Sequence, residues 1–481
     1  MTTGSTQDTC YAPKVWSGGN CACPSDTPYY QSGTNKCVKC YQADESKPYW
    51  NGLTCTTCPS DEPTWDSTNK QCVACTTAKP YWDTATQTCK TCYEVNNAKP
   101  KWNTSTSACE ACPTANPYWD GTQCTILSTW CGNQIKNIGL TNYSASGDTV
   151  TYNTNMTVSK NLDISDCNLV VKGTLTVNSG ITLKAKNVSA TSSTSNGINN
   201  AGTITVTNKV YGNGYAHGVH NQSTGKLTAG ILEGMQSAPI QDSSGNYLSE
   251  IIIINDGVMN IDTVISSQGT TWGASFQNNG TLTANHLIGI ASGLFTGFIN
   301  SNIMKIGTID LKGALYNTKG SLTVTGKARV QTFSHVAGTS SFQDLYASSY
   351  SGGGILSNGS GSVSVGRLVA TSGYTNYGVT VRAKTIYALY FEQDFWGPGL
   401  RYCENHWAGP GTTIVTGSIN YCQNPPAGGT GTCTGKGKVT GTYQKKCIPT
   451  CSGSTPIWNG ESCEGCPSIR PNWNAEYGIC E

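Results

Sequence analysis

Charged side chains are scarce in this sequence: only 12% of its 481 residues are Asp, Glu, Lys or Arg, and the formal net charge is +2. Average soluble proteins carry about twice that share of charge. A nucleic-acid-binding surface needs clustered Lys and Arg, which are few and scattered here, so no nucleic-acid partner is expected. Long apolar runs are missing too, and no stretch approaches the roughly 20 apolar residues of a membrane span.

Helical periodicity is also missing, since no long segment spaces its apolar residues three and four apart. The polarity of the chain comes from Ser, Thr, Asn and 55 Gly. Such a composition is compatible with disorder. Against disorder, apolar residues recur in short patterned runs and aromatic residues are regularly placed, which favours a folded chain without long helices.

Cysteine, in contrast, is abundant: there are 24, of which fourteen lie between residues 10 and 124 and eight between residues 403 and 480. Cys131 and Cys167 lie outside these two groups. A reducing cytosol does not maintain so many structural disulfides, so we expect an extracellular or cell-surface location.

The N-terminal cysteines delimit an internal repeat with a period of about 17 residues. Each unit begins with Cys, continues with Pro and an aromatic residue, as in 48–50, 80–82 and 117–119, then passes through a polar turn and ends with Cys. The pattern returns in 451–463 and 466–480. A unit this short cannot build a core, so a disulfide would replace it, with the aromatic ring lying across the bridge.

If each unit closes on itself, every N-terminal cysteine has a partner. The pairs would be Cys10–Cys21, Cys23–Cys37, Cys40–Cys55, Cys58–Cys72, Cys75–Cys89, Cys92–Cys109 and Cys112–Cys124, and at the other end Cys451–Cys463 and Cys466–Cys480. The other disulfide candidates are Cys131, Cys167, Cys433, Cys447 and the pair Cys403–Cys422.

Two alternatives remain open for these cysteines. Bonds within each Cys-x-x-Cys, such as Cys37 with Cys40, would leave Cys10 and Cys480 without partners. The spacing of the two Cys-x-x-Cys motifs in 55–58 and 72–75 would also suit a four-cysteine zinc site.

Between residues 132 and 400 the sequence repeats short strand-like motifs. Apolar and small polar residues alternate, which is typical of half-buried strands, and Asn-Gly or Ser-Gly turns separate them. Examples are 173–177 (GTLTV), 202–206 (GTITV), 280–283 (GTLT), 307–311 (GTIDL) and 320–324 (GSLTV). Similar strands at intervals of about 20 to 30 residues predict an all-β parallel β-solenoid, in which each coil stacks on the previous one. A β-sandwich is the alternative fold.

The sequence therefore predicts five regions. These are an N-terminal tail in 1–9, tandem disulfide modules in 10–131, the β-solenoid in 132–400, a disulfide-bonded cap or linker in 401–450 and two further modules in 451–481.

The GTLTV-like motifs, the Asn-Asn-x-Gly turn at 199–202 and the low charge resemble right-handed parallel β-helix adhesins of bacterial surfaces. Autotransporter passengers and filamentous haemagglutinins are the nearest types, and the cysteine units resemble short Cys-Pro-rich repeats of secreted proteins. The chain differs from autotransporters because it lacks a C-terminal membrane barrel and is rich in cysteine. The resemblance implies attachment or assembly.

One cluster combines residue types that suit a glycan site. Trp rings stack on sugars and carboxylates bind hydroxyl groups. The candidate contacts are Glu392, Asp394, Trp396, His406 and Trp407. The same segment could instead cap the open end of the solenoid, which exposes apolar strands. His217 and His220 resemble a metal pair but have no third ligand nearby, so we expect no catalytic residue, cofactor or metal site.

We therefore expect an extracellular structural and adhesive protein whose partners are other copies of itself and surface or matrix glycans and proteins. Similar modules at the two ends suggest head-to-tail filaments. The alternatives are a polysaccharide lyase or hydrolase, which would need an acidic pair on one solenoid face, and a trimeric protein of the phage tail-spike type.

Overall fold

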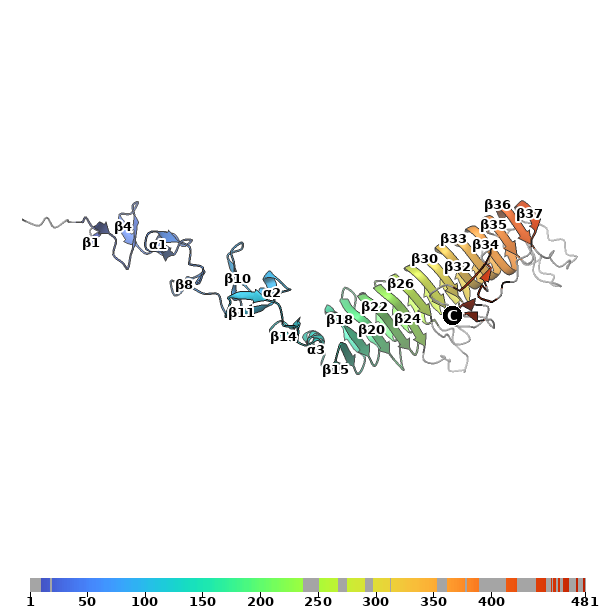
Figure 1. The fold of residues 1–481 in the computed structure, drawn as a ribbon, viewed down its shortest axis with the longest axis horizontal. Helices are drawn as coiled ribbons and strands as arrows, with labels where there is room; N and C mark the ends of the chain where they lie inside the picture. The colour runs from blue at the N-terminus through green and yellow to red at the C-terminus, as the bar shows by residue number, and fades with distance from the viewer. Residues whose placement is uncertain are drawn as a thin grey trace, which may run out of the picture. The chain divides into compact units, whose positions relative to one another are not determined.

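A computed structural model of the chain describes residues 10–17, 20–236, 251–266, 275–289, 297–311, 313–352, 361–376, 379–388, 412–421, 438–446 and parts of 451–480. The chain divides into two compact units, Met1–Ile126 and Leu127–Glu481. Small disulfide-bonded hairpins make up the first unit, and a parallel β-solenoid makes up most of the second (Figure 1). The predicted all-β fold is confirmed, and the sandwich alternative is wrong because the ladders are parallel.

The first unit is a row of two-stranded antiparallel hairpins, one for each cysteine unit. Its helices, α1 (Cys40–Ala43) and α2 (Cys92–Val95), are single turns. The hairpins are β1 (Val15–Ser17) with β2 (Asn20–Ala22), β3 (Tyr29–Gln31) with β4 (Lys36–Val38), β5 (Tyr49–Trp50) with β6 (Cys55–Thr56), β7 (Thr64–Asp66) with β8 (Gln71–Val73), β9 (Tyr81–Asp83) with β10 (Thr88–Lys90), β11 (Lys101–Asn103) with β12 (Ala108–Glu110), and β13 (Tyr118–Trp119) with β14 (Cys124–Thr125).

In every hairpin an aromatic residue lies directly opposite the cysteine that closes the unit. Because directly opposed side chains contact each other, the ring becomes the main apolar mass beside the disulfide. The opposed pairs are Trp16 with Cys21, Tyr30 with Cys37, Trp50 with Cys55, Trp65 with Cys72, Trp82 with Cys89, Trp102 with Cys109 and Trp119 with Cys124.

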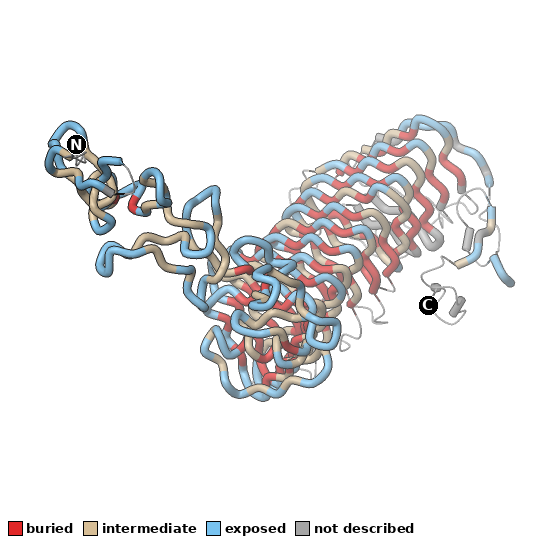
Figure 2. Tube along the Cα trace, turned by 60° about the vertical axis from the view of Figure 1, so that its left-hand side comes forward, coloured by how far each residue is buried: buried red, intermediate tan, exposed pale blue. Residues whose placement is uncertain are grey.

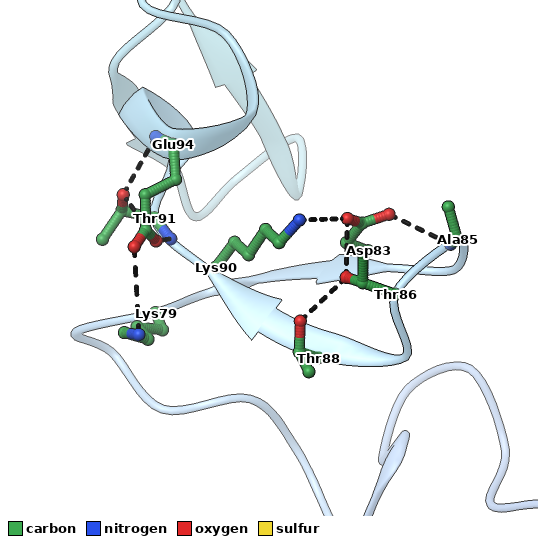
Figure 3. Close-up of polar contacts among 8 residues, drawn as sticks. All are labelled: Lys79, Asp83, Ala85, Thr86, Thr88, Lys90, Thr91 and Glu94. Atoms are coloured by element: carbon green, nitrogen blue, oxygen red, sulfur yellow. Dashed lines mark hydrogen bonds and ion pairs between the residues drawn. The ribbon is translucent and has the colours of Figure 1, made fainter.

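A carboxylate or amide immediately after the aromatic residue organises the turn of most units. In the unit that ends at Cys89, Asp83 accepts a hydrogen bond from the backbone N–H of Ala85 at 3.0 Å and another from the Thr86 hydroxyl at 2.8 Å (Figure 3). The Lys90 ammonium also bonds Asp83. These contacts, with that of Lys90 first, lower the pKa of Asp83 to about 2, so the turn keeps its charge in mild acid.

The disulfides join the first and last cysteine of each N-terminal unit. They are Cys10–Cys21, Cys23–Cys37, Cys40–Cys55, Cys58–Cys72, Cys75–Cys89, Cys92–Cys109 and Cys112–Cys124. The alternative pairing within each Cys-x-x-Cys is therefore wrong. Neighbouring units touch through a few side-chain contacts, such as that of the Tyr41 and Trp65 rings, whose centroids are 5.4 Å apart, and that of Lys70 over the Tyr41 ring.

Replacing Cys75 and Cys89 together by serine should unfold that unit alone. The bridge closes a loop with a sequence separation of 14 residues, so its loss should cost about 3 kcal/mol of local stability. Hydrogen exchange should show lost protection in 75–89 and retained protection in the unit that Cys58 and Cys72 close. Simultaneous loss of protection in both units would mean that the array unfolds as one body.

The second unit begins with a short helix that packs on the first strands of the solenoid. The helix α3 (Leu127–Asn137) is followed by the antiparallel pair β15 (Tyr143–Ser146) and β16 (Thr149–Tyr152). Its buried residues include Cys131 and Ile135, and the Cys131–Cys167 disulfide joins it to the solenoid. The helix thus covers apolar side chains at the start of the stack.

From β16 onward the coils stack in parallel register. Short strands form what we call the first ladder: β17 (Met156–Val158), β19 (Leu175–Val177), β21 (Ile198–Asn200), β23 (Val219–Asn221), β25 (Ile253–Asn255), β27 (Phe276–Asn278), β29 (Gly297–Asn300) and β31 (Ala314–Asn317).

As far as β31, longer strands alternate with the short ones and supply two further ladders. Their bounds are β18 (Leu162–Val171), β20 (Thr182–Thr191), β22 (Thr203–Gly214), β24 (Lys226–Gln236), β26 (Val258–Ser266), β28 (Thr281–Gly289), β30 (Ile303–Leu311), β32 (Ser321–His335), β33 (Gly338–Gly352), β34 (Gly361–Asn376), β35 (Thr380–Ala388), β36 (Thr412–Tyr421) and β37 (Lys438–Lys445). From β32 on the long strands follow one another, and the last residues of β32, Thr332 to His335, continue the first ladder. A register shift divides several of the long strands, as between Ile164 and Asn168 in β18. In the long strands, we call the ladder formed by the residues before this shift the second ladder, and the ladder formed by the residues directly after it the third ladder.

Buried positions alternate with more exposed ones along the strands, and the buried positions line up between coils (Figure 2). In the second ladder one buried column contains Leu183, Ile204, Leu227, Met259, Leu282, Met304 and Leu322, each at most 2% exposed. The burial of each such side chain contributes about 1.5–3 kcal/mol. The GTLTV-like motifs therefore place Leu or Ile in the core and Thr outside, as their alternation predicts.

A column of buried asparagines lies where the first ladder turns into the second. Each donates a hydrogen bond from its side-chain nitrogen to the side-chain oxygen of the next, over 2.8–2.9 Å. Most also donate to a backbone carbonyl near the turn, as Asn278 does to Ile303 at 2.8 Å. The asparagine ladder contains Asn200, Asn221, Asn255, Asn278, Asn300 and Asn317.

His335 occupies the next position of this ladder and is fully buried. Its Nδ1 lies 2.9 Å from the Ser340 hydroxyl, and burial lowers its pKa to about 4. An unfolded histidine titrates near pH 6.5, so the unfolded chain binds a proton between these values that the folded chain does not. The contribution of neutral His335 is complete above about pH 6.5 and is lost as the pH falls toward 4.

Denaturant unfolding should therefore show a stability loss of about 3 kcal/mol from His335 between pH 6.5 and 4. His335→Asn, which extends the asparagine ladder by one member, should remove this part of the pH dependence. Because carboxyl groups titrate in both proteins, the difference between the two curves isolates His335. Parallel curves would contradict the depressed pKa.

The stack continues beyond residue 400, since β36 and β37 extend the parallel ladder within the range 401–450 that the sequence assigns to a cap. Two hairpins follow: β38 (Ile457–Trp458) with β39 (Cys463–Glu464), and β40 (Trp473–Asn474) with β41 (Ile479–Cys480). The Cys451–Cys463 disulfide closes the first, and Cys466 is also disulfide-bonded. Among the described residues, no helix has the length and apolarity that crossing a membrane requires.

Candidate adhesive surface

The outward side of the second ladder carries mostly hydroxyl groups. Strand alternation turns every second side chain outward, and the parallel register aligns these side chains in two columns. We call this surface the hydroxyl face; it contains Thr203, Thr205, Thr228, Thr281, Thr283, Ser321, Thr323, Thr339, Ser341, Ser362 and Ser364. Most of these side chains are exposed and the others are half-buried.

Over three successive strands, β32, β33 and β34, both columns of the hydroxyl face consist only of Ser and Thr. Adjacent strands lie about 4.8 Å apart and alternate residues about 6.7 Å apart along a strand. Each hydroxyl can both donate and accept a hydrogen bond. Over these three strands the face is therefore a regular, uncharged hydrogen-bonding array. Elsewhere it is interrupted: β26 places Val258 and Asn260 in the two columns, β30 places Ile303 and Lys305 there, and Lys184, Lys226 and Arg382 occupy further positions.

The third ladder has a different outward side, on which acids and bases alternate between coils. Lys209 forms an ion pair with Glu233. Further along, Asp310 lies opposite Arg329, and Asp344 lies between Lys327 and Arg367 in neighbouring strands. Opposite charges on neighbouring strands support the sheet.

Acidic residues elsewhere on the described solenoid also lie beside bases or amides. Asp163 bonds Lys184 at 3.0 Å, and Asp262 accepts a hydrogen bond from Asn285 at 2.7 Å. The Asn285 amide lowers the pKa of Asp262, which favours an ionised carboxylate. Asp163 and Asp262 are thus held in separate polar contacts.

The two histidines considered as a metal pair have protein partners. His217 Nδ1 lies 2.6 Å from the carbonyl oxygen of Ile251, and His220 Nε2 lies 2.9 Å from a carboxylate oxygen of Asp256. Burial, together with the nearby His220, lowers the pKa of His217. Within the described ranges, no group of three His, Cys, Asp or Glu residues is placed to hold a metal ion.

The disulfides also argue against a zinc site at the two Cys-x-x-Cys motifs in 55–58 and 72–75. Cys55 is bonded to Cys40, and Cys58 to Cys72. A sulfur atom in a disulfide is not the thiolate that zinc requires. No described cysteine is free.

Several residues singled out in the sequence lie outside the described residues. They are the candidate glycan contacts Glu392, Asp394, Trp396, His406 and Trp407 and the disulfide candidates Cys403, Cys422, Cys433 and Cys447. The glycan site at 392–407 therefore stays a prediction.

The strand alternation predicts outward Thr, Ser and Asn on the long faces of the solenoid, but it does not show which of them align as the hydroxyl face. The outward Thr or Ser residues of the GTLTV-like motifs form a surface only when the coils are in register.

Comparison with family models, with curated proteins and with solved structures found no match to this chain.

Proposed function

We propose that this chain is an extracellular structural and adhesive protein. The observation that carries the proposal is the hydroxyl face, which presents ordered hydrogen-bonding groups with little charge on a solenoid whose core and asparagine ladder hold it in register. Disulfides at every described cysteine support an oxidising environment outside the cell.

Glycans of a cell surface or matrix are the partners that suit this face. Sugar hydroxyls donate and accept hydrogen bonds, as Ser and Thr do, and many weak contacts along an extended polymer add through avidity. The part of the face on β32, β33 and β34 carries only Ser and Thr, which predicts binding that changes little with salt, because screening weakens only contacts between exposed charges.

The test is binding of the intact protein to a panel of immobilised polysaccharides. A variant with Thr205, Thr228, Thr283 and Thr323 all changed to Val removes hydroxyls from the hydroxyl face and keeps β-branched side chains. It should lose at least about tenfold in apparent affinity, which corresponds to 1.4 kcal/mol. The matched control changes Thr157 and Thr176, which point outward from the first ladder, to Val and should bind as the unchanged protein does.

Failure of the unchanged protein to bind any polysaccharide of the panel would refute glycan adhesion. Equal binding by both variants would move the adhesive surface away from the hydroxyl face.

A further inference from the structure

The first disulfide module of the C-terminal tail packs on the outer surface of the solenoid. Tyr346, Val369 and Tyr387 point outward from the third ladder in successive strands, yet they are only 8%, 1% and 8% exposed. Cys451 and Cys463, the two ends of the module's disulfide, pack against them. We call these three side chains the docking patch.

The path of the chain explains why the tail reaches this patch. Tyr387, Asn420 and Gln444 share the patch's column in β35, β36 and β37, so the last strand ends beside it. Lys446, just after β37, lies over the Tyr387 ring with its ammonium 5.9 Å from the ring centre. The tail then turns back over its own third ladder.

A module of the first unit matches the docked module in sequence and geometry. Cys112–Cys124 and Cys451–Cys463 have the same sequence separation of 12 and the same Cα–Cα distance of 5.6 Å. Both place Trp opposite the closing cysteine, and both have the pattern Pro-x-Trp-x-Gly at the same positions between their cysteines. A surface that accepts one module therefore has the shape and apolar character to accept the other.

We propose that the docking patch binds the Cys112–Cys124 module of a second copy of this chain, and that the Cys451–Cys463 module of its own tail competes for it. Because the contact joins two different surfaces, it is heterologous, and its repetition builds a filament unless the rotation closes a ring. This proposal rests on the proposed structural role, and it identifies the docking patch as the surface through which copies of the chain assemble.

The size of the patch sets the strength of the contact. Three covered side chains form a small interface, far below the roughly 1,000 Å² of a stable complex, so binding between copies is weak. The tail has the advantage of an effective concentration in the millimolar range. The unchanged protein should therefore be mostly monomeric in dilute solution and assemble when its tail is removed or when many copies are crowded on a surface.

The experiment measures molar mass by sedimentation equilibrium between about 5 µM and 500 µM, a range chosen for a weak contact. A chain that ends after Lys446 lacks the competing tail, and none of the described residues that it loses belongs to the main solenoid core. Its average mass should rise at least about twofold across this range. Adding Val369→Lys, which places a charge on the outer patch, should abolish the rise, as should adding Cys112→Ser with Cys124→Ser.

The matched control adds Cys23→Ser with Cys37→Ser, which removes a unit with a sequence separation of 14, and should leave the rise intact. A folded tail-less chain that stays monomeric to 500 µM, or assembly that Val369→Lys leaves unchanged, would overturn the proposal.

If the tail-less chain does not fold, the same mass measurement is made on the full-length chain with Cys451→Ser and Cys463→Ser, and the same outcomes apply. Oxidative labelling of Tyr387 then shows whether the docking patch is open in this variant. If the patch remains covered without the disulfide, Trp458→Asp is added to release the module. Polysaccharide binding by a chain that fails to assemble would leave the adhesive proposal standing, so the two can fail separately.

Discussion

Replacing Asn278 with leucine is expected to lower the free energy of unfolding of the solenoid by about 4 kcal/mol. The buried side chain accepts a hydrogen bond from Asn255 at 2.8 Å and donates to Asn300 at 2.9 Å and to the carbonyl oxygen of Ile303 at 2.8 Å. Leucine satisfies none of these groups, and each buried group left without its partner costs about 1–3 kcal/mol. Denaturant unfolding followed by circular dichroism measures the loss.

The neighbouring residue offers a matched control for this change. Asn279 is exposed, and its amide donates to Asp256 at 2.8 Å. Asn279→Leu should therefore change the stability by less than about 1 kcal/mol. Equal unfolding midpoints for the two variants would show that the asparagine ladder contributes nothing beyond ordinary turn contacts.

Gly280→Ala should also destabilise the solenoid, by about 3 kcal/mol or more. A Cβ atom at Gly280 would lie 2.1 Å from the carbonyl oxygen of Gly257 in the coil below, and 2.8 Å from that of Asp256. Both obstacles are backbone atoms, so the coils must separate locally, which strains the ladder and the asparagine contact beside it. The close approach of two turns, and not an unusual φ, is what requires glycine here.

Gly33 provides the control, since a Cβ atom there would meet nothing within 4 Å. Gly33→Ala should leave the unfolding transition of the solenoid unchanged, whereas Gly280→Ala should shift it to lower denaturant. A negligible shift for Gly280→Ala would mean that the turns move apart at little cost.

Residue patterns were enough to predict the architecture of both units. The Cys-to-Cys spacing and the Pro-aromatic motif predicted disulfide-closed modules, because a disulfide is the main source of stability available to so short a unit. Alternation in motifs such as 202–206 predicted which residues enter the core, since side chains of a strand point alternately to its two sides.

Contacts between residues far apart in the chain could not be predicted in the same way. Nothing in the sequence distinguishes Asn278 and Asn300 from asparagines in ordinary surface turns, because their burial depends on coils stacking in register. The helix α3 was not predicted, although Leu127, Trp130, Cys131 and Ile135 have helical spacing over its three turns. The docking of Cys451 and Cys463 on Tyr387 depends on where the last strand ends.

By itself the sequence determined the local chemistry: the disulfide brackets, the strand alternation and the oxidising environment that they imply. Tertiary structure alone decided which polar side chains became a buried ladder, which formed the exposed hydroxyl face, and where the tail module packs. The physical reason is that a solenoid brings together residues about one coil apart in the chain, and their meeting depends on the register of the whole stack.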